Sequence, residues 1–483
     1  MDSLFLLLLA LGLVLVFFSG NWRLVLFYTV FVGFAQDPLR KITPGQPQYL
    51  VGLVLVAAAL SMLALYTSSR HIPFKNAFKL DSALLQYYPI FLWLLVISCL
   101  NSFLRTGAIE VPFIGVMIYL SPLLAIWLGF HFATRPGAVV RFIQVYIIMV
   151  SFYAFTVLLS FWGVASPLLA EVGKGLVIYL DVGIGLQGHT GLWRTAEVAA
   201  WHLGAAACFS IILGVRTRKI LYIVLSFLLS AFLMYTSVLT GRRKVFTLFV
   251  AFVVSYVILI SLNARRLTRD TFFSGLFVLG ATAAIFVLSG GLSDLESGAY
   301  GAFFRRSTSV FSEANDRFNS TALGGLNSAI QQAGFFGFGV GTTYSSAATS
   351  IGAEIASTGK GGWVEGGLGK IIYEIGVVGF AFLGAMVFLL GRLYLRIARS
   401  PIIVNLPDHL LVLGLIAFLV SNLPNFSAAS QVYNDFFVLL VLGLSSGFIL
   451  GLASSIDYMN SRALSESVPN SSMPSLTTPS APS

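Results

Sequence analysis

Charged residues are scarce in this chain. Only 10% of its 483 residues are Asp, Glu, Lys or Arg, whereas 57% are hydrophobic and the mean hydropathy is +0.89. A soluble core cannot bury so large an apolar fraction, and the apolar runs repeatedly reach the length that crosses a bilayer. The composition therefore excludes an ordinary soluble domain and indicates a polytopic membrane protein.

Cysteine and the common site motifs are scarce as well. The two cysteines, Cys99 and Cys208, lie inside apolar runs and give no disulfide framework. The sequence has no P-loop and no metal-ligand spacing, so we expect neither a metal nor another cofactor, and His189 and His202 read as satisfied polar groups. The net charge of +10 lies in short connections without interleaved aromatics, which argues against nucleic acid as a partner.

The apolar runs predict an all-α transmembrane bundle, because lipid offers no partner for free backbone groups and the runs lack strand alternation. We expect roughly thirteen spans, within about 12–14. An N-terminal bundle (1–289) and C-terminal helices (366–456) would flank one large external loop (290–365), and the Ser/Pro-rich tail (465–483) is expected to be disordered. The expected spans are 3–19, 23–36, 49–66, 87–104, 111–132, 142–164, 196–215, 220–239, 245–262, 271–289, 366–391, 408–424 and 435–454.

Three successive basic connections predict the topology. "RTRK" and "NARRLTR" flank "TGRRK" at 240–244. Single crossings put the middle connection opposite the other two, and the positive-inside bias places the more basic outer pair in the cytoplasm. TGRRK, the 166–194 connection and the 290–365 loop then lie outside, and the C-terminal tail lies inside. "DPLRK" at 37–41 is a mild violation of this arrangement.

The external elements carry arginines that suit an anionic ligand. A guanidinium donates two parallel hydrogen bonds to phosphate oxygens and keeps its charge. Other interpretations stay open: the TGRRK cations fit a membrane anchor or packing against the loop, Glu313 and Arg317 have the spacing of a helical ion pair, and the rest fit lipid head groups. The candidate arginines are Arg194, Arg242, Arg243, Arg305, Arg306 and Arg317.

A glycine-rich stretch, "GFGVG" at 337–341, has the spacing of a nucleotide turn. It lacks the flanking strand and helix of a dinucleotide-binding unit. We therefore expect it to be a flexible turn in the long loop.

The order of these features resembles the O-antigen ligase and polymerase family of bacterial membrane glycosyltransferases. The matching parts, within roughly residues 190–390, are "LTGRRKVF", "NDRFNSTALGGLNSAIQQAGFFGFGVGTTYSS" and "GGWVEGGLGKIIYEIGVVGF". The resemblance implies an inner-membrane enzyme that transfers a glycan from undecaprenyl pyrophosphate, with its long loop in the periplasm. It also implies membrane lipid and polysaccharide-export or chain-length proteins as partners, and pyrophosphate contacts by Arg242 or Arg243 and by Arg317.

One departure from the family favours polymerisation of an O-antigen or exopolysaccharide repeat over ligation. Family ligases present a histidine before the last external-loop span, whereas Glu365 takes the comparable place here and the 290–365 loop has no histidine. In the expected metal-independent mechanism, Arg317 and the other arginines stabilise the leaving pyrophosphate, Glu365 accepts the proton of the acceptor, and Tyr344 and Trp363 stack on sugars. Glu365 also has a structural interpretation, since a helix dipole favours a carboxylate in the first turn.

Two other classes of function stay open. A transporter or lipid-glycan flippase would also need a cationic cavity, but it should carry paired repeats or ionisable groups deep in its spans, which are nearly free of charge here. A non-catalytic assembly protein would use the long loop for protein contacts.

Overall fold

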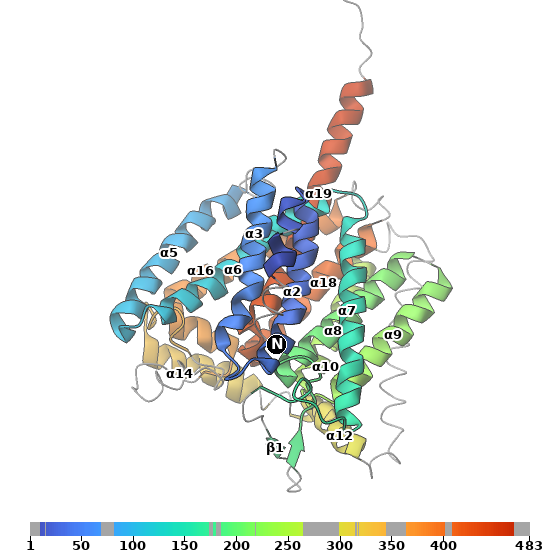
Figure 1. Ribbon diagram of the computed structural model, residues 1–483. Coiled ribbons are helices and arrows are strands. Elements are labelled where there is room, and N and C mark those ends of the chain that lie inside the picture. The colour runs from blue at the N-terminus through green and yellow to red at the C-terminus, as the bar shows by residue number, and fades with distance from the viewer. Residues whose placement is uncertain are drawn as a thin grey trace, which may run out of the picture.

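The computed structural model is an all-α helical bundle (Figure 1). The structure describes residues 10–14, 16–68, 82–172, 177–179, 185–217, 219–263, 299–313, 316, 318–343, 364–400 and 408–467. A short antiparallel hairpin of β1 (Val177–Tyr179) and β2 (Gly185–Gln187) adds the one two-stranded sheet in this part of the chain. The helices are α2 (Trp22–Ile42), η1 (Gln48–Gly52), α3 (Leu53–Thr67), α5 (Ser82–Thr106), α6 (Glu110–Ala133), α7 (Ala138–Phe161), α8 (Ala196–Thr217), α9 (Ile220–Val238), α10 (Lys244–Leu262), α12 (Ala299–Ser312), η4 (Phe318–Leu323), α14 (Gly324–Ala333), α16 (Gly367–Arg399), α18 (His409–Ala428), η5 (Gln431–Asn434) and α19 (Phe436–Ser467).

Ten of the described helices are long and apolar enough to cross a membrane. Nine coincide within four residues with an expected span, and the tenth, Gly367–Arg399, extends eight residues beyond the expected end at 391. The predicted multi-pass bundle is confirmed. The expected span at 23–36 is also helical and lies in α2, which is not among the ten. The expected span at 271–289 lies outside the described residues, as do residues 3–9 and 15 of the first span and nearly all of the 465–483 tail.

The buried centre of the bundle contains α8 and α19. The apolar windows of both helices are 94% buried, which a helix facing lipid cannot reach. Gly443, Gly447 and Gly451 bring α19 close to α6: a Cβ on Gly447 would lie 2.2 Å from the carbonyl oxygen of Ile126. Glycines at this spacing let two helix backbones approach closely and gain van der Waals contact.

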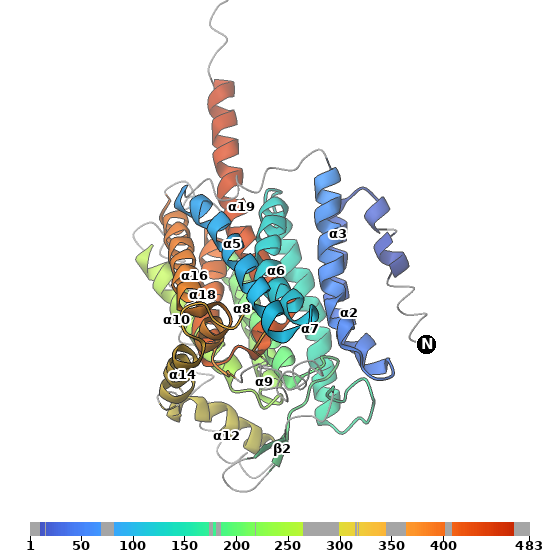
Figure 2. The same ribbon diagram turned by 90° about the vertical axis from the view of Figure 1, so that its left-hand side faces the viewer.

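Connections gather at two ends of the bundle because successive helices run in alternating directions. α12, α14 and the β1–β2 hairpin lie together at one end, which we call the α12 end, and the last turns of α19 project from the opposite end (Figures 1 and 2). The opposite end also joins α8 to the start of α18, where Arg216 Nε lies 2.6 Å from Asp408 Oδ1.

Three predicted external connections meet at the α12 end. The backbone N–H of His189 donates to the carbonyl oxygen of Leu239 at 3.0 Å, and Arg243 contacts Glu313 just beyond α12. The 166–194 connection, the TGRRK turn and the long loop therefore share one end, as the charge parity requires. That this end faces outward stays a prediction.

The GFGVG stretch supplies hydrogen bonds that α16 loses at a kink. Gly376 interrupts α16 with φ 73° and ψ 179°. The freed carbonyl oxygens of Tyr373 and Glu374 accept hydrogen bonds from the backbone N–H groups of Phe338 (2.7 Å) and Gly339 (2.9 Å). Because a buried carbonyl without a partner is costly, this exchange stabilises the kink.

The same stretch is closely packed against α5 and α6. A Cβ on Gly339 would lie 2.3 Å from the backbone nitrogen of Ser102, and one on Gly341 would lie 2.2 Å from the carbonyl oxygen of Val111. Both glycines have positive φ, 104° and 81°. The expectation of a flexible turn is therefore wrong, since glycine is needed here for close backbone packing.

Candidate functional site

The tight turn between α9 and α10 directs its three cations to different places. Gly241 takes a positive φ of 67°, and the hydroxyl of the buried Thr240 accepts a hydrogen bond from the backbone N–H of Arg242 at 3.3 Å. Arg242 and Lys244 face one set of partners, whereas Arg243 faces another. TGRRK is therefore not a single three-cation site.

Arg242 and Lys244 approach the same carboxylate. Arg242 Nη1 and Lys244 Nζ lie 3.5 and 4.0 Å from Oε1 of Glu197, which stands in the first turn of α8, where the helix dipole favours negative charge. Lys244 Nζ also lies 4.0 Å from Glu365 Oε1 and donates to Gln431 Oε1 at 3.0 Å. Two cations, two carboxylates and one amide from four segments of the chain thus meet at the α12 end.

A narrow crevice opens among these residues, and we call it the α8–α10 crevice. Glu197, Arg242, Lys244 and Gln431 line its polar side, and Trp201 contributes to its apolar side. The side chains of Arg242, Glu197 and Lys244 are 15%, 24% and 26% exposed, respectively. Partial burial lowers the local dielectric while leaving the charges within reach of a ligand, which strengthens their attraction for an anion.

Glu365 borders the crevice and is fixed through its backbone. Its carbonyl oxygen accepts hydrogen bonds from the backbone N–H of Ser430 at 2.9 Å and from the Ser430 hydroxyl at 3.3 Å. Its side chain is 37% exposed and reaches Lys244. Glu365 directly precedes Gly366, the N-cap of α16, so the dipole interpretation also fits this position.

Arg243 lies outside the crevice lining and contacts the long loop. Its Nη1 donates to Ser309 Oγ at 2.8 Å and lies 2.6 Å from Glu313 Oε2. The Arg243 side chain is 5% exposed, so loss of its carboxylate partner would leave a desolvated charge. Of the alternatives from the sequence, this geometry favours packing against the loop, with Glu313 engaged by Arg243.

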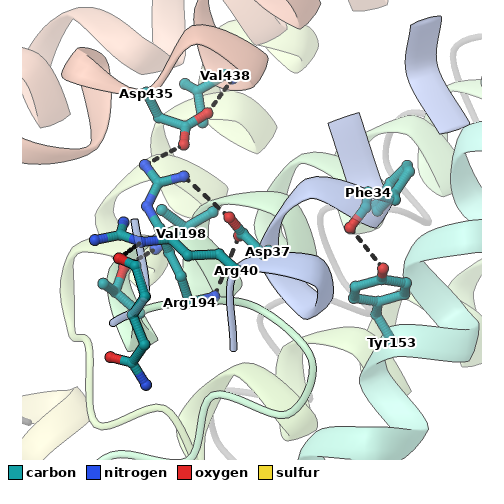
Figure 3. A network of polar contacts seen from close by, with 10 residues as sticks. Phe34, Asp37, Arg40, Tyr153, Arg194, Val198, Asp435 and Val438 are labelled. Carbon is teal, nitrogen blue, oxygen red and sulfur yellow. Dashed lines mark hydrogen bonds and ion pairs between the residues drawn. The ribbon is translucent and has the colours of Figure 1, made fainter. Parts of the chain in front are cut away.

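Arg194 lies between two carboxylates (Figure 3). Its Nη1 is 3.1 Å from Asp37 Oδ1 and its Nη2 contacts Asp435 Oδ2, and these aspartate side chains are 3% and 1% exposed. Asp435 also caps α19 by accepting a hydrogen bond from the backbone N–H of Val438 at 2.8 Å. Burial alone would lower the pKa of Arg194, but Asp435 and Asp37 outweigh burial and raise that pKa above its usual value. This geometry favours a structural role, and glycan binding by Arg194 stays a prediction.

The other predicted site residues are not brought to the crevice by the described residues. Arg305 is exposed and Arg306 is half-buried, and both lie on α12 outside the crevice lining. This placement suits head-group contacts as well as glycan contacts. Arg317, Tyr344 and Trp363 lie outside the described residues.

His189 has the partner expected of a satisfied polar group, whereas His202 is satisfied at one ring nitrogen only: its buried Nε2 has no hydrogen-bond partner among the described residues. His189 Nδ1 lies 3.0 Å from Ser160 Oγ, and burial lowers the pKa of His189. His202 Nδ1 lies 2.6 Å from the hydroxyl oxygen of Tyr146. In the described part of the chain, no group of three or more His, Cys, Asp or Glu residues is arranged to hold a metal ion.

The sequence interpretation gave Glu197 only as a fallback for the base, after Glu365, and did not include Lys244 or Gln431 among the site residues. Glu197 follows "WRTA" at the start of a helix, a common place for a carboxylate, and Gln431 lies in a short connection between α18 and α19. Lys244 directly follows Arg242 and Arg243, so the run of three basic residues was the sequence feature that could have identified it as a site residue. No protein-family model matches the chain, and comparison with curated proteins finds no match either.

Proposed function

We propose that this protein is a bacterial inner-membrane glycosyltransferase that polymerises oligosaccharide units carried on undecaprenyl pyrophosphate, with its α12 end in the periplasm. The supporting observation is the α8–α10 crevice, where Arg242 and Lys244 lie beside the carboxylates of Glu197 and Glu365. Cations for a pyrophosphate and a carboxylate for proton transfer are the groups that such a transfer needs.

Arg242 and Lys244 bind the pyrophosphate in this proposal. Arg242 supplies a planar fork for two oxygens, and Lys244 supplies a point charge. Both act on the negative charge that grows as the bond between the anomeric carbon and the phosphate oxygen breaks. Arg317 joins them by resemblance to the family, and Tyr344 and Trp363 remain candidates for contacts with sugar rings.

A carboxylate at the crevice accepts the proton of the incoming sugar hydroxyl. The acceptor oxygen attacks the anomeric carbon, the glycosyl–phosphate bond breaks, and undecaprenyl pyrophosphate leaves with the bonding electron pair. A single displacement of this kind inverts the anomeric carbon. Glu365 is the candidate from the sequence, and Glu197 lies at the same 4.0 Å distance from Lys244 Nζ.

The ion pairs of the crevice indicate the order of events in this mechanism. Arg242 and Lys244 approach Glu197, and Lys244 also approaches Glu365. A pyrophosphate carries more charge than one carboxylate and competes for the same cations. Its arrival weakens these ion pairs and leaves a carboxylate available to accept the proton of the acceptor hydroxyl.

A transporter remains the second candidate because charged groups occur inside the helices. Lys370 and Glu374 of α16 are buried, and the Glu374 carboxylate accepts hydrogen bonds from Tyr119 (2.8 Å) and Thr343. The sequence interpretation treated the spans as nearly free of charge, so this burial supports the alternative. However, both residues lie in the first turns of α16, near the α12 end, whereas a midplane transport site would lie deeper.

Chain elongation tests the proposal. Purified protein in lipid vesicles is incubated with undecaprenyl-pyrophosphate-linked oligosaccharide, and the products are separated by length. We expect longer chains without added metal or nucleotide, and a loss of about a hundredfold in rate for Arg242→Lys, because an ammonium cannot replace the fork. Arg216→Lys, at the opposite end, is the matched control. Translocation of the donor across the vesicle membrane without elongation would favour the transporter.

A further inference from the structure

A second basic recess lies at the end opposite α12, between the starts of α2 and α7 and the end of α6. It has a volume of about 550 Å³ including its open mouth, and its lining includes Arg23, Arg135 and Arg141 but no carboxylate among the described residues. This recess is separate from the α8–α10 crevice and takes no part in the proposed reaction.

Two of the arginines that line this recess have no ion-pair partner among the described residues. Arg135 and Arg141 are exposed, and neither has an ion-pair partner in the described part of the chain. Arg141 lies in the first turn of α7, where the positive end of the helix dipole disfavours a cation. Gly137, the N-cap of α7, provides no side-chain cap. Two arginines crowded at a helix N-terminus raise the local positive potential, which a bound anion would offset.

Apart from Asn21, the remaining wall of the recess is apolar. Leu24, Phe27 and Phe132 line it beside the arginines, and Leu24 is 45% exposed at the edge of the bundle. A free phosphate would use the arginines and leave this wall in water. A glycerophospholipid would place its phosphate at the arginines and an acyl chain along the wall, so the two kinds of lining match the two parts of one ligand.

We propose that this recess binds an anionic glycerophospholipid. The arginines hold the phosphate, and the apolar wall contacts the first part of an acyl chain. The predicted topology places this end at the cytoplasmic face, where anionic head groups attract basic side chains. The bound lipid neutralises the like charges that meet at the start of α7.

Native mass spectrometry of the delipidated full-length protein tests this site by titration with phosphatidylglycerol. We expect one saturable lipid that phosphatidylcholine, inorganic phosphate and glycerol phosphate do not displace at equal concentration. Each basic contact contributes about fivefold in affinity, so Arg135→Gln/Arg141→Gln should weaken binding about 25-fold. Arg135→Lys/Arg141→Lys should keep most of it.

The control carries the same charge change outside the recess. Arg392→Gln/Arg396→Gln removes two exposed arginines from the last part of α16, towards the same end of the bundle, and should leave binding unchanged. Equal weakening in both Gln pairs would mean general surface attraction and overturn the proposal. Displacement by inorganic phosphate would show a free-anion site and also overturn it. If the Gln pair does not fold, single Arg135→Gln should still weaken binding about fivefold, and unchanged binding would refute the site.

Discussion

Replacing Arg194 separates its structural role from a binding role. Arg194→Gln removes the guanidinium that Asp37 and Asp435 share, and leaves two carboxylates that are 3% and 1% exposed. Breaking a buried ion pair by deleting one partner costs about 3–5 kcal/mol, because the remaining charge is desolvated and uncompensated. Total stabilities of about 5–15 kcal/mol are typical of folded domains, so the loss should be a large fraction of the whole.

The position of the pair in the fold adds to this cost. Asp37 lies near the end of α2, Arg194 lies two residues before the start of α8, and Asp435 caps α19 (Figure 3). Loss of Arg194 therefore weakens the contact among three helices that are distant in sequence. Proton uptake by one carboxyl group would limit the cost, so the lower end of the range is the safer expectation.

Thermal unfolding of purified protein is the assay, together with the amount of protein found in the membrane. We expect Arg194→Gln to lower the apparent melting temperature by several degrees and to reduce the folded yield, while elongation per folded molecule is largely retained. The melting temperature of Arg194→Lys should lie between those of the unchanged protein and Arg194→Gln, because an ammonium contacts one carboxylate more readily than both. Arg242→Gln is the matched control, since its pair with Glu197 is partly exposed and should be worth at most about 1 kcal/mol. A normal melting temperature with lost elongation in Arg194→Gln would refute this reasoning and make Arg194 a binding residue.

Three further predictions concern the base, the glycine stretch and the topology. Glu197→Gln and Glu365→Gln should differ in elongation rate: the variant that lacks the base should lose about a hundredfold to ten-thousandfold. Glu110→Gln, at an exposed position in the first turn of α6, is the control, and near-normal rates in both crevice variants would remove them as candidates. Gly339→Ala should sharply lower the folded yield because its Cβ would meet Ser102, whereas Gly325→Ala, which has open space around it, should not; equal yields would contradict the packing argument. In a cysteine-free background, Arg305→Cys and Lys219→Cys should react with an impermeant reagent from opposite sides of the membrane, and labelling from the same side would reject the topology.

The positions of the helices could be predicted from the sequence because each span is a local property. A run of about 20 apolar residues must be helical in lipid, whatever surrounds it. The ten described spans follow this rule closely. The packing of the GFGVG stretch could not be predicted in this way. Glycine spacing by itself indicates only that the backbone is free to adopt unusual conformations. Its fit against Ser102 and Val111 depends on helices far away in the chain.

The candidate site could be predicted only in part, for the same reason. The basic turn indicated an anion site, and Glu365 was found near it. The direction of each cation depends on the turn at Gly241 and on partners supplied by α8, α12 and η5. Neighbouring Arg242 and Arg243 look equivalent in sequence, but Arg242 lines the crevice, whereas Arg243 contacts Ser309 of α12.

The basic cluster at 37–41 departs from the positive-inside expectation, and its contacts explain how it is tolerated. Asp37 pairs with Arg194, and Arg40 Nε donates to the carbonyl oxygen of Gln46 at 2.9 Å. Lys41 Nζ donates to the carbonyl oxygens of Leu168 and Gly191 at 3.1 and 2.6 Å, and to Thr190 Oγ1 at 3.2 Å.

Lys41 holds the 166–194 connection against the end of α2, and Arg40 holds the turn that follows α2. Arg40 and Lys41 are 7% and 5% exposed, so they are part of the protein interior and not of a head-group anchor. Arg135 and Arg141 at the opposite end differ from this pair. Arg40 and Lys41 donate hydrogen bonds to carbonyl oxygens of the chain, whereas Arg135 and Arg141 are exposed and have no carboxylate partner among the described residues. Counting basic residues treats the two pairs alike. Of these two pairs, Arg135 and Arg141 are the one that can contact an anionic membrane surface. They lie at the end that the charge parity assigns to the cytoplasm.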